Sequence, residues 1–346
     1  MKAIIQQDTT DPSSLAWTDA DDPTPRPGEA LVRIHAAGVN RGDVLQAAGH
    51  YPPPPGASDI IGLEAAGTIE AFGPPLESSH ESGSTSASES SEQSDEQPAK
   101  QWNIGDKCGM LLAGGGYAER VAVPVTQLFP VPRGWSLTDT AGVIEVAATV
   151  WSNLGMVAGM QKGQTVLIHG GSGGIGTFAI QLAHATGLTV ATTAGNADNL
   201  ELCRSLGADI LINYTDDDFV AVMKEHGGAD IILDIMGAKY LDSNVKALGE
   251  KGHLVIIGMQ GGVKGELNIG RLLSKRGSIT ATNVRGRSLD DKAAVVADTI
   301  KHVWPLLEDG TVSAQVTKTL PIADAAEAHR LLKSREVTGK IVLTVE

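Results

Sequence analysis

The chain has 346 residues, 42% of them hydrophobic, a length typical of two domains with sizeable cores. Its formal net charge of −14 repels phosphate and argues against nucleic acid or an anionic membrane surface as a partner. No apolar run approaches the ~18 residues of a membrane helix, and the first residues lack a signal-peptide pattern. The two cysteines, Cys108 and Cys203, lie far apart. A reduced, cytoplasmic protein without a disulfide framework is therefore expected.

The first 75 residues predict an all-β unit, because short strand patterns alternate with turns rich in proline and glycine. Residues 30–35 form one predicted strand, residues 36–43 lead into a short helix, and residues 60–70 resume a strand pattern. Tyr51 stands directly before four prolines, which exclude regular structure because proline removes a backbone donor and fixes φ.

Residues 77–97 interrupt this pattern with nine serines, six acidic residues and no lysine or arginine. Such a segment buries too little apolar surface to offset its ordering entropy, so it is predicted to be a disordered acidic insert. Strand patterns return at residues 102–131, and residues 137–158 are predicted to be helical.

From residue 165 the pattern becomes alternating strand and helix, which predicts a parallel sheet covered on both faces. A first strand is predicted near residues 166–168. Five more strands are predicted at residues 189–193, 210–213, 231–234, 254–257 and 278–282, and helices are predicted between the first four of these five. A helix near residues 293–307 follows. Residues 339–345 look like a strand that returns to the first domain.

Residues 165–187 organise the second half of the chain, because they combine a strand, a glycine turn and a helix. The turn fits the pattern G-x-G-x-x-G between Gly171 and Gly176. Glycines there let the backbone approach a pyrophosphate, and free N–H groups at the helix start point toward it. The context makes a dinucleotide site the favoured interpretation. The alternative is a glycine turn without a ligand.

The end of the next strand bears on the choice of cofactor. Folds selective for NAD place Asp or Glu there, on the ribose hydroxyls. Residues 192–196 contain no acid. The sequence thus disfavours NADH and leaves room for a 2′-phosphate.

Several segments in order resemble one family over nearly the whole chain outside the acidic insert: AGVNRGD at 37–43, HYPPPPGAS at 50–58, IIGLEAAG at 60–67, GGGYAE at 114–119, IEVAATVW at 144–151, IHGGSGGIGT at 168–177, LGAD at 206–209 and GKIVL at 339–343. They resemble the zinc-independent, zeta-crystallin-like quinone oxidoreductases of the medium-chain dehydrogenase/reductase superfamily. The segment after His50 looks closest to the stress-inducible NADPH:quinone oxidoreductase branch.

The resemblance implies a doubly wound Rossmann domain at residues 129–284 beside a GroES-like β-barrel domain built from residues 1–128 and 285–346. It also implies a homodimer formed by pairing sheet edges. The active site would lie in the cleft between the domains.

The resemblance assigns roles to particular residues. Asn40 and Thr149 would lie near the nicotinamide ribose, and Tyr51 would line the substrate pocket and orient an acceptor oxygen. The residues expected to bind the cofactor elsewhere are Gly171, Ser172, Gly173, Gly174 and Ile175 at the pyrophosphate, Gly195, Asn196, Tyr214 and Arg335 at the 2′-phosphate, and Ile257, Gly258 and Met259 at the nicotinamide. Asn199 stands where the family has a lysine. In the alternative interpretations Asn40 only caps a helix and Tyr51 only packs against the prolines.

A metal site is not expected. Zinc-dependent relatives in the superfamily have a Cys and a His-Glu pair where this sequence has Asn40 and Leu63-Glu64. Without a Lewis acid, electron-poor acceptors fit better than alcohols.

The predicted function is hydride transfer from NADPH to a quinone. One alternative is reduction of α,β-unsaturated carbonyls, and another is a non-catalytic NADPH-binding regulatory protein.

Overall fold

The structure is a computed structural model that describes residues 1–75, 101–334 and 336–345. The predicted acidic insert at residues 77–97 and the expected phosphate ligand Arg335 lie outside the described residues. The disorder of the insert and the phosphate contact of Arg335 therefore stay predictions.

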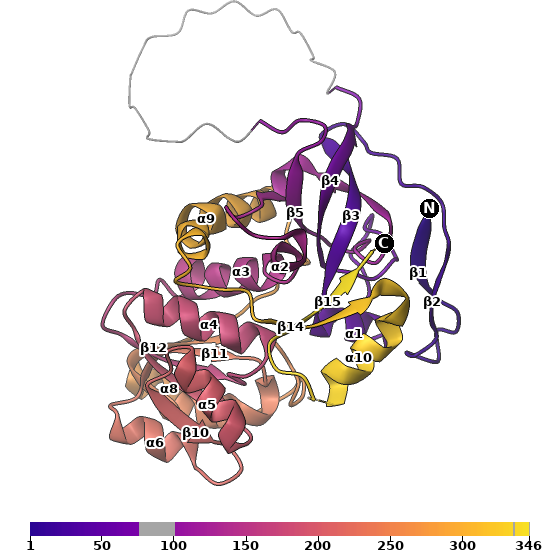
Figure 1. Cartoon of the computed structure of the whole chain (residues 1–346). Helices are drawn as coiled ribbons and strands as arrows, with labels where there is room; N and C mark the ends of the chain where they lie inside the picture. Colours follow the sequence, from indigo (N-terminus) through magenta and orange to yellow (C-terminus); the bar gives the residue numbers. More distant parts are fainter. Residues whose placement is uncertain (76–100, 335, 346) are drawn as a thin grey trace, which may run out of the picture.

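The first domain is built on a seven-stranded sheet with the order β14-β15-β3-β4-β5-β7, in which β6 also pairs with β3; β1 and β2 form a separate pair. The strands are β1 Lys2–Gln6, β2 Leu15–Asp19, β3 Glu29–Val39, β4 Glu64–Phe72, β5 Lys107–Leu111, β6 Arg120–Pro124, β7 Leu128–Pro130, β14 Val316–Pro321 and β15 Lys340–Thr344. β15 runs antiparallel to β3, with Ile341 opposite Val39. The prediction that the C-terminal strand returns to the first domain is confirmed (Figure 1).

The second sheet is parallel throughout and has the order β10-β9-β8-β11-β12-β13. Its strands are β8 Thr165–His169, β9 Thr189–Ala194, β10 Ile210–Asn213, β11 Ala229–Asp234, β12 Leu248–Ile256 and β13 Ser278–Ala281. The order of strands is 3-2-1-4-5-6 within this domain, the doubly wound Rossmann arrangement. The fold class predicted from the sequence is confirmed.

The described helices are α1 Arg41–Ala47, α2 Leu137–Ala141, α3 Ile144–Trp151, the π-helical η2 Ser152–Val157, α4 Gly174–Ala185, α5 Ala197–Ser205, α6 Phe219–Glu225, α7 Leu241–Ala247, α8 Ile269–Lys275, α9 Leu289–Glu308 and α10 Ala325–Ser334, with short 3-10 turns at Val125–Gln127, Gly237–Tyr240 and Ile322–Asp324. None of them is long and apolar enough to cross a membrane.

The prediction of one helix over residues 137–158 is wrong in its continuity. The helix breaks at Gly142 and Val143, and Val143 has the non-helical angles φ −123° and ψ −19°. A Cβ on Gly142 would lie 2.6 Å from Val316 on β14, so the break lets the chain pack closely on the first sheet. Helix α8 was not predicted, because none of its residues is buried and its apolar pattern is therefore weak.

Helix α3 lies between the two sheets (Figure 1), in contact with β5 on one side and with α4 on the other. Helix α9 shares the core cluster of α3 and α4 through Val295, Val303 and Trp304. The same cluster includes Leu111, which precedes the expected Rossmann domain, and Phe129, which is the first residue of that domain. The domain limits at residues 128 and 285 therefore stay a prediction.

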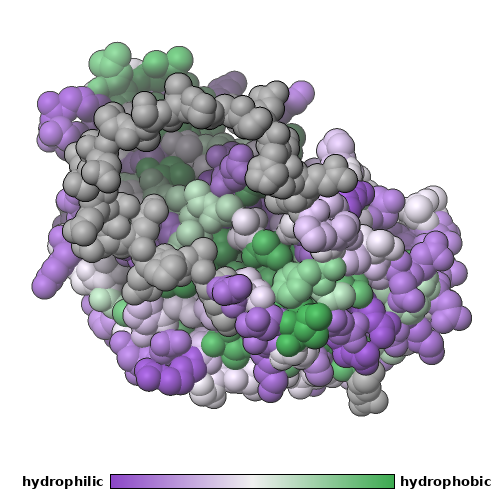
Figure 2. All heavy atoms as spheres, turned by 90° about the horizontal axis from the view of Figure 1, so that it is seen from above, coloured by the Kyte–Doolittle hydropathy of each residue, from purple (hydrophilic) through white to green (hydrophobic). Residues whose placement is uncertain are grey.

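The surface in Figure 2 is a mixture of hydrophilic residues and smaller hydrophobic groups. Among the described residues, exposed large hydrophobic side chains are concentrated in α8 and the segment before it, at Met259, Val263, Leu267, Ile269 and Leu273. These residues precede β13, the last described strand of the Rossmann sheet.

Candidate active site

The glycine turn between β8 and α4 has the geometry expected of a pyrophosphate site. A Cβ on Gly171 would lie 2.2 Å from Thr192 Oγ1, and one on Gly176 would lie 2.3 Å from the carbonyl oxygen of Gly170. Both positions therefore require glycine. Gly173, in contrast, has no neighbour closer than 3.6 Å to such a Cβ. The turn is thus open at Gly173, directly before the N–H groups that begin α4 and that have no partner within the helix.

The C-terminal strand contacts the same turn. The backbone N–H of Gly339 donates to the carbonyl oxygen of Ser172 at 2.9 Å. A Cβ on Gly174 would lie 2.7 Å from Cδ of Lys340. Ile175 packs partly buried against the core shared by α3 and α4. The turn is therefore supported from both halves of the protein.

Three of the residues expected near a 2′-phosphate, Gly195, Asn196 and Tyr214, follow the ends of β9 and β10. The Tyr214 hydroxyl is 2.4 Å from the position of a Cβ on Gly195. Asn196 precedes α5, and its Oδ1 accepts the backbone N–H of Asn199 at 2.8 Å. The first turn of α5 also carries the acidic residue Asp198, which was not considered in the sequence analysis.

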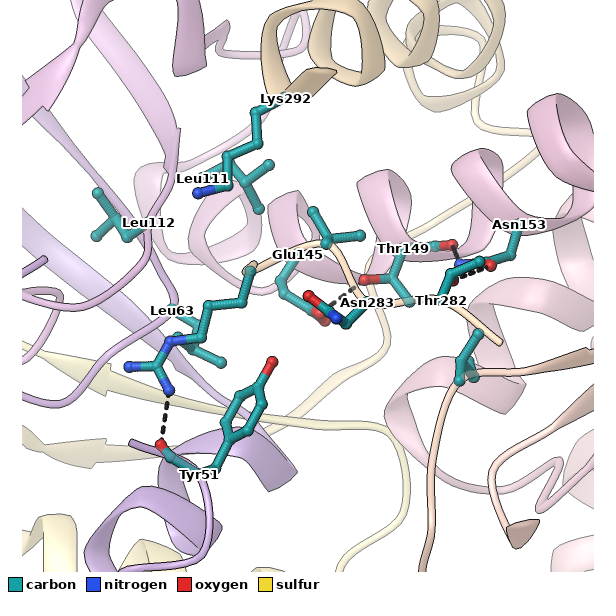
Figure 3. Close-up of a pocket in the computed structure, with 13 residues that line it drawn as sticks. Tyr51, Leu63, Leu111, Leu112, Glu145, Thr149, Asn153, Thr282, Asn283 and Lys292 are labelled. Atoms are coloured by element: carbon teal, nitrogen blue, oxygen red, sulfur yellow. Dashed lines mark hydrogen bonds between the residues drawn. The ribbon is translucent and has the colours of Figure 1, made fainter. Parts of the chain in front are cut away.

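Thr149, Ile257 and Tyr51 line one pocket between the two domains (Figure 3). The pocket holds about 520 Å³ of empty space, its open mouth included. Gly258 follows Ile257, and a Cβ there would meet the carbonyl oxygen of Ile235 at 2.7 Å. Met259 does not line the pocket; its side chain is 62% exposed. The structure therefore brings Thr149, Ile257 and Tyr51 together and leaves Met259 outside.

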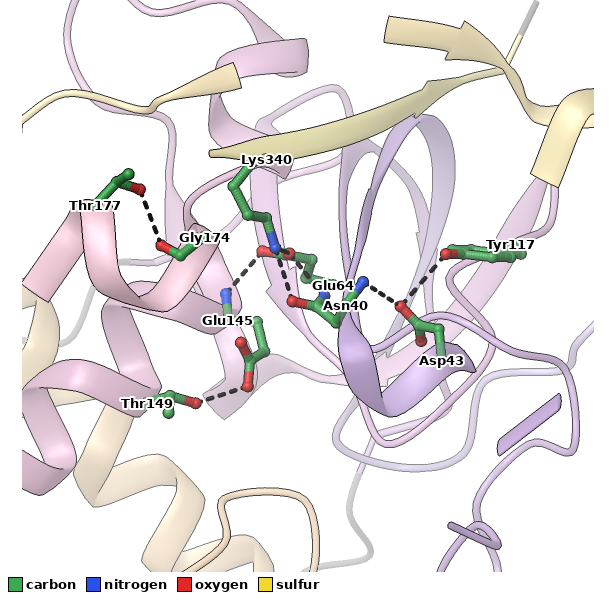
Figure 4. A network of polar contacts seen from close by, with 9 residues as sticks. All are labelled: Asn40, Asp43, Glu64, Tyr117, Glu145, Thr149, Gly174, Thr177 and Lys340. Atoms are coloured by element: carbon green, nitrogen blue, oxygen red, sulfur yellow. Dashed lines mark hydrogen bonds and ion pairs between the residues drawn. The ribbon is translucent and has the colours of Figure 1, made fainter. Parts of the chain in front are cut away.

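Asn40 belongs to a buried polar network rather than to the lining of this pocket (Figure 4). Its Nδ2 donates to Glu64 Oε1 at 2.8 Å, and its Oδ1 accepts from Lys340 Nζ at 2.7 Å. Lys340 also donates to Glu64 Oε1, so a buried ion pair joins β15 to β4. Glu64 Oε2 accepts the backbone N–H of Glu145, at the start of α3. Glu145 in turn accepts from the Thr149 hydroxyl at 2.7 Å.

Burial raises the pKa of two acids at this network, Asp43 and Glu145. Burial raises the pKa of Asp43 to about 7, against the opposing effects of the Asn40 N–H bond and the Lys340 charge. Asp43 also accepts from the Tyr117 hydroxyl at 3.3 Å. Burial likewise raises the pKa of Glu145, which the Lys340 charge partly offsets. The chain of contacts from Lys340 to Thr149 thus connects the first domain with the pocket.

Two cations that the sequence analysis missed line the pocket, Arg285 and Lys292. Arg285 donates to the carbonyl oxygens of Ala113 and Tyr51 and to Gln46 Oε1. Its guanidinium lies 4.7 Å from the centre of the Tyr51 ring. Lys292 stands in the first turn of α9. Neither residue follows a sequence motif, so only the fold could reveal them.

No group of three or more His, Cys, Asp or Glu side chains in the described part of the chain could hold a metal ion. Cys108 and Cys203 are both buried, in different core clusters. Asn40 and Glu64 both bind the Lys340 ammonium instead.

Comparisons with known proteins match this architecture. Residues 26–133 match the family described as alcohol dehydrogenase GroES-like domain, and residues 174–301 match the family described as zinc-binding dehydrogenase. A 2-haloacrylate reductase from Burkholderia sp is 27% identical over 99% of this chain and 98% of its own. A quinone oxidoreductase from Pseudomonas aeruginosa is 26% identical over 96% of each chain. The solved structure of a mycobacterial protein complexed with NADPH is 27% identical, with a TM-score of 0.83 over 99% of this chain and 100% of that one.

A GroES-like sheet joined to a Rossmann sheet, with a glycine turn after the first Rossmann strand and a pocket between the two domains, defines a medium-chain dehydrogenase/reductase. The chain belongs to this superfamily, among its quinone oxidoreductase-like members. It is accordingly an oxidoreductase.

Proposed function

We propose that this protein is an NADPH-dependent, zinc-independent reductase that transfers hydride to a quinone. The observation that carries the proposal is the open glycine turn at Gly173. Its next residue, Gly174, contacts Lys340, and Lys340 belongs to the polar network that reaches Thr149 in the pocket. Backbone N–H groups of residues 171–175 bind the pyrophosphate, and Thr149 and Ile257 contact the nicotinamide end. The cofactor supplies the hydride, while the protein aligns the acceptor and excludes water.

NADPH is favoured over NADH by the polar, acid-free end of β9. Asn196, which follows Gly195 beside the Tyr214 hydroxyl, and Tyr214 itself are two proposed phosphate ligands, and Arg335 is the third. The NADPH complex of the mycobacterial relative supports this choice. Asn199 supplies no charge where the family has lysine, and a neutral phosphate contact is weaker than a charged one. We therefore propose a modest preference for NADPH.

Zinc independence is supported by the occupant of the Asn40–Glu64 pair. The Lys340 ammonium already binds both side chains and is 4% exposed. A divalent cation at the same oxygens would repel this buried charge. The donor set therefore suits an ammonium better than zinc.

Tyr51 is the proposed group that orients the acceptor. Burial raises the pKa of its phenol, so the hydroxyl stays protonated and can donate to an acceptor oxygen. No strong base is required, because a reduced quinone can take its proton from water. Asn40 acts on the site through Glu64, whose carboxylate holds the start of α3.

A homodimer is the proposed assembly. Among the described strands, β13 has a partner only on its β12 side. Val263, Ile269 and Leu273 lie in the segments before it and are 69–74% exposed. A second copy that pairs with this edge would cover both the free backbone groups and the apolar side chains.

A second candidate is reduction of α,β-unsaturated carbonyl compounds. The observation in its favour is the pair of cations, Arg285 and Lys292, at the pocket. The 2-haloacrylate reductase relative supports the same reaction class. A non-catalytic NADPH-binding protein is the third possibility, and only turnover measurements separate it from the enzymes.

The test is oxidation of NADPH and of NADH by the purified protein with one ortho-quinone, one para-quinone and one enone. Quinone-dependent oxidation of NADPH is expected. Turnover of the enone alone would replace the quinone assignment with the second candidate. Tight NADPH binding without any turnover would contradict the enzyme. A matched pair of variants checks the cofactor site: Gly176→Ala should abolish NADPH binding, whereas Gly173→Ala, which has room for a methyl group, should weaken it far less.

A further inference from the structure

Lys292 is a buried cation without a partner among the described residues. The side chain is 5% exposed and lines the pocket. Its backbone N–H donates to Ser288, but no ion pair or hydrogen bond in the described part of the chain involves its ammonium. Asp290 and Asp291, in the same first turn of α9, are exposed and form no ion pair with it. Figure 3 shows the amine pointing into the pocket beside Leu111.

Arg285 places a second cation at this pocket, and it forms no ion pair among the described residues. It is 6% exposed, and all its hydrogen bonds go to neutral oxygens, those of Ala113, Tyr51 and Gln46. Burial and the charge of Arg285 together lower the pKa of Lys292, which shows that the two cations repel each other. The N-terminus of the 20-residue helix α9 adds further positive potential around Lys292.

The remaining charged group in the lining, Glu145, does not neutralise the pair. It accepts from Thr149 and lies beside Thr149 in Figure 3, on a different element from Lys292. Buried charges in proteins are normally paired, because an isolated charge carries a large desolvation penalty. Two cations without an acid partner therefore suit a site whose anion arrives with the ligand.

We propose that Lys292 and Arg285 form an anion subsite that binds a carboxylate on the hydride acceptor. The inference rests on the proposed reductase and narrows its substrates to conjugated acceptors that carry a carboxylate, such as 2-enoates or carboxylated quinones. With a 2-enoate, the hydride from NADPH adds its electron pair to the β-carbon and NADP⁺ forms. A proton from water adds to the α-carbon, the C=C bond becomes single, and the carboxylate is unchanged. The two cations hold that carboxylate and stabilise the negative charge that develops next to it.

The first experiment compares matched acceptors in the presence of NADPH: acrylate against but-3-en-2-one, and 1,4-naphthoquinone-2-carboxylate against 1,4-naphthoquinone. The enzymes are the unmodified protein, Lys292→Met, and Lys301→Met, which removes an exposed lysine from the same helix. Lys292→Met should lower kcat/KM about tenfold to hundredfold for one or both carboxylated acceptors and leave the neutral ones within about twofold. If the effect is seen with acrylate, the carboxylate belongs to a 2-enoate substrate; if it is seen with the naphthoquinone carboxylate, it belongs to a quinone. Lys301→Met should leave kcat/KM unchanged for both the carboxylated and the neutral acceptors.

Equal losses on charged and neutral acceptors would overturn the subsite, as would no loss on either. Circular dichroism of each variant separates such losses from misfolding.

A second measurement does not depend on turnover. Propanoate, a saturated carboxylate, should bind to the protein saturated with NADP⁺, and calorimetry should show its Kd rising about tenfold or more in Lys292→Met. Absence of propanoate binding to the unmodified protein would overturn the subsite even if quinones are reduced. If no acceptor is reduced, the proposed reductase fails, and propanoate binding then decides the anion subsite by itself.

Discussion

Lys340 and Lys292 are both buried lysines near the cleft, 4% and 5% exposed, yet only Lys340 faces an acid. The Lys340 ammonium binds Glu64 and Asn40, inside a network that also fixes the start of α3. Arg285 donates to neutral oxygens, and the Lys292 ammonium has no hydrogen-bond or ion-pair partner among the described residues. The first cluster is complete within the fold, whereas the second lacks a counter-charge.

This difference separates two uses of buried charge. A pair that is complete within the chain contributes to the native state mainly because breaking it is costly. A cation without a partner destabilises the native state until a ligand compensates it, so it is more readily explained by function. The following predictions test that contrast in order of expected effect.

The largest effect is expected for Lys340→Met. This change leaves the Glu64 carboxylate buried without its cation and should lower the free energy of unfolding by about 3–5 kcal/mol. Urea unfolding followed by circular dichroism measures it. The double variant Lys340→Met/Glu64→Gln should recover part of the loss. A loss below about 1 kcal/mol in the single variant would show that the pair is not the stabilising element assumed here.

The second prediction concerns Asp43, whose pKa in the folded protein is raised from 3.8 to about 7. Because the folded state holds this proton more tightly than the unfolded state, the resulting stability is full below about pH 4 and is lost as the pH rises to about 7. Asp43→Asn should remove this pH dependence, worth about 2 kcal/mol between pH 5 and 7. Unfolding curves at several pH values measure it. The control variant Asp59→Asn, at an exposed residue, should keep the dependence of the free energy of unfolding on pH. If Asp43→Asn also kept that dependence, groups other than Asp43 would be its cause.

The third prediction places a new cation where it is neither buried nor paired. Asn199→Lys, at a half-buried position in the first turn of α5, should increase the preference for NADPH over NADH about tenfold. The ratio of kcat/KM values for the two cofactors, or of their Kd values, measures it. The uncharged Asn199→Gln variant serves as its control. An equal change in both variants would argue against a phosphate at this position.

The smallest effect is expected for Lys292→Met on stability. Because this ammonium has no acid to leave behind, its removal should change the free energy of unfolding by less than about 1 kcal/mol, with stabilisation the expected sign. The same urea experiment as for Lys340→Met measures it, with Lys301→Met as reference. A loss as large as that of Lys340→Met would erase the contrast between the two lysines.

Local pattern was sufficient for much of the fold. Alternating strand and helix periodicity predicted every strand of the Rossmann sheet, and the glycine spacing predicted the turn before α4. Gly187, just after α4, adopts a left-handed φ of +82°, and its N–H donates to the carbonyl oxygen of His184. Period and backbone freedom are local properties, so they can be read in the sequence. The break at Gly142 was missed because its cause, contact with Val316, lies 174 residues away.

Some residues of the candidate site could be predicted from the sequence, and others were revealed only by the structure. Glycine spacing, the acid-free end of β9 and the family resemblance pointed to the cofactor groove and to Tyr51, because those signals depend on short segments. The partners of the Asn40 side-chain amide are 24 and 300 residues away, at Glu64 and Lys340. Lys292 reaches the pocket from α9, which packs against α3, and Arg285 reaches it from the connection between β13 and α9. The sequence by itself determined the elements and the phosphate-binding turn, while the tertiary structure alone decided which charges are paired, because burial and pairing depend on contacts between distant segments.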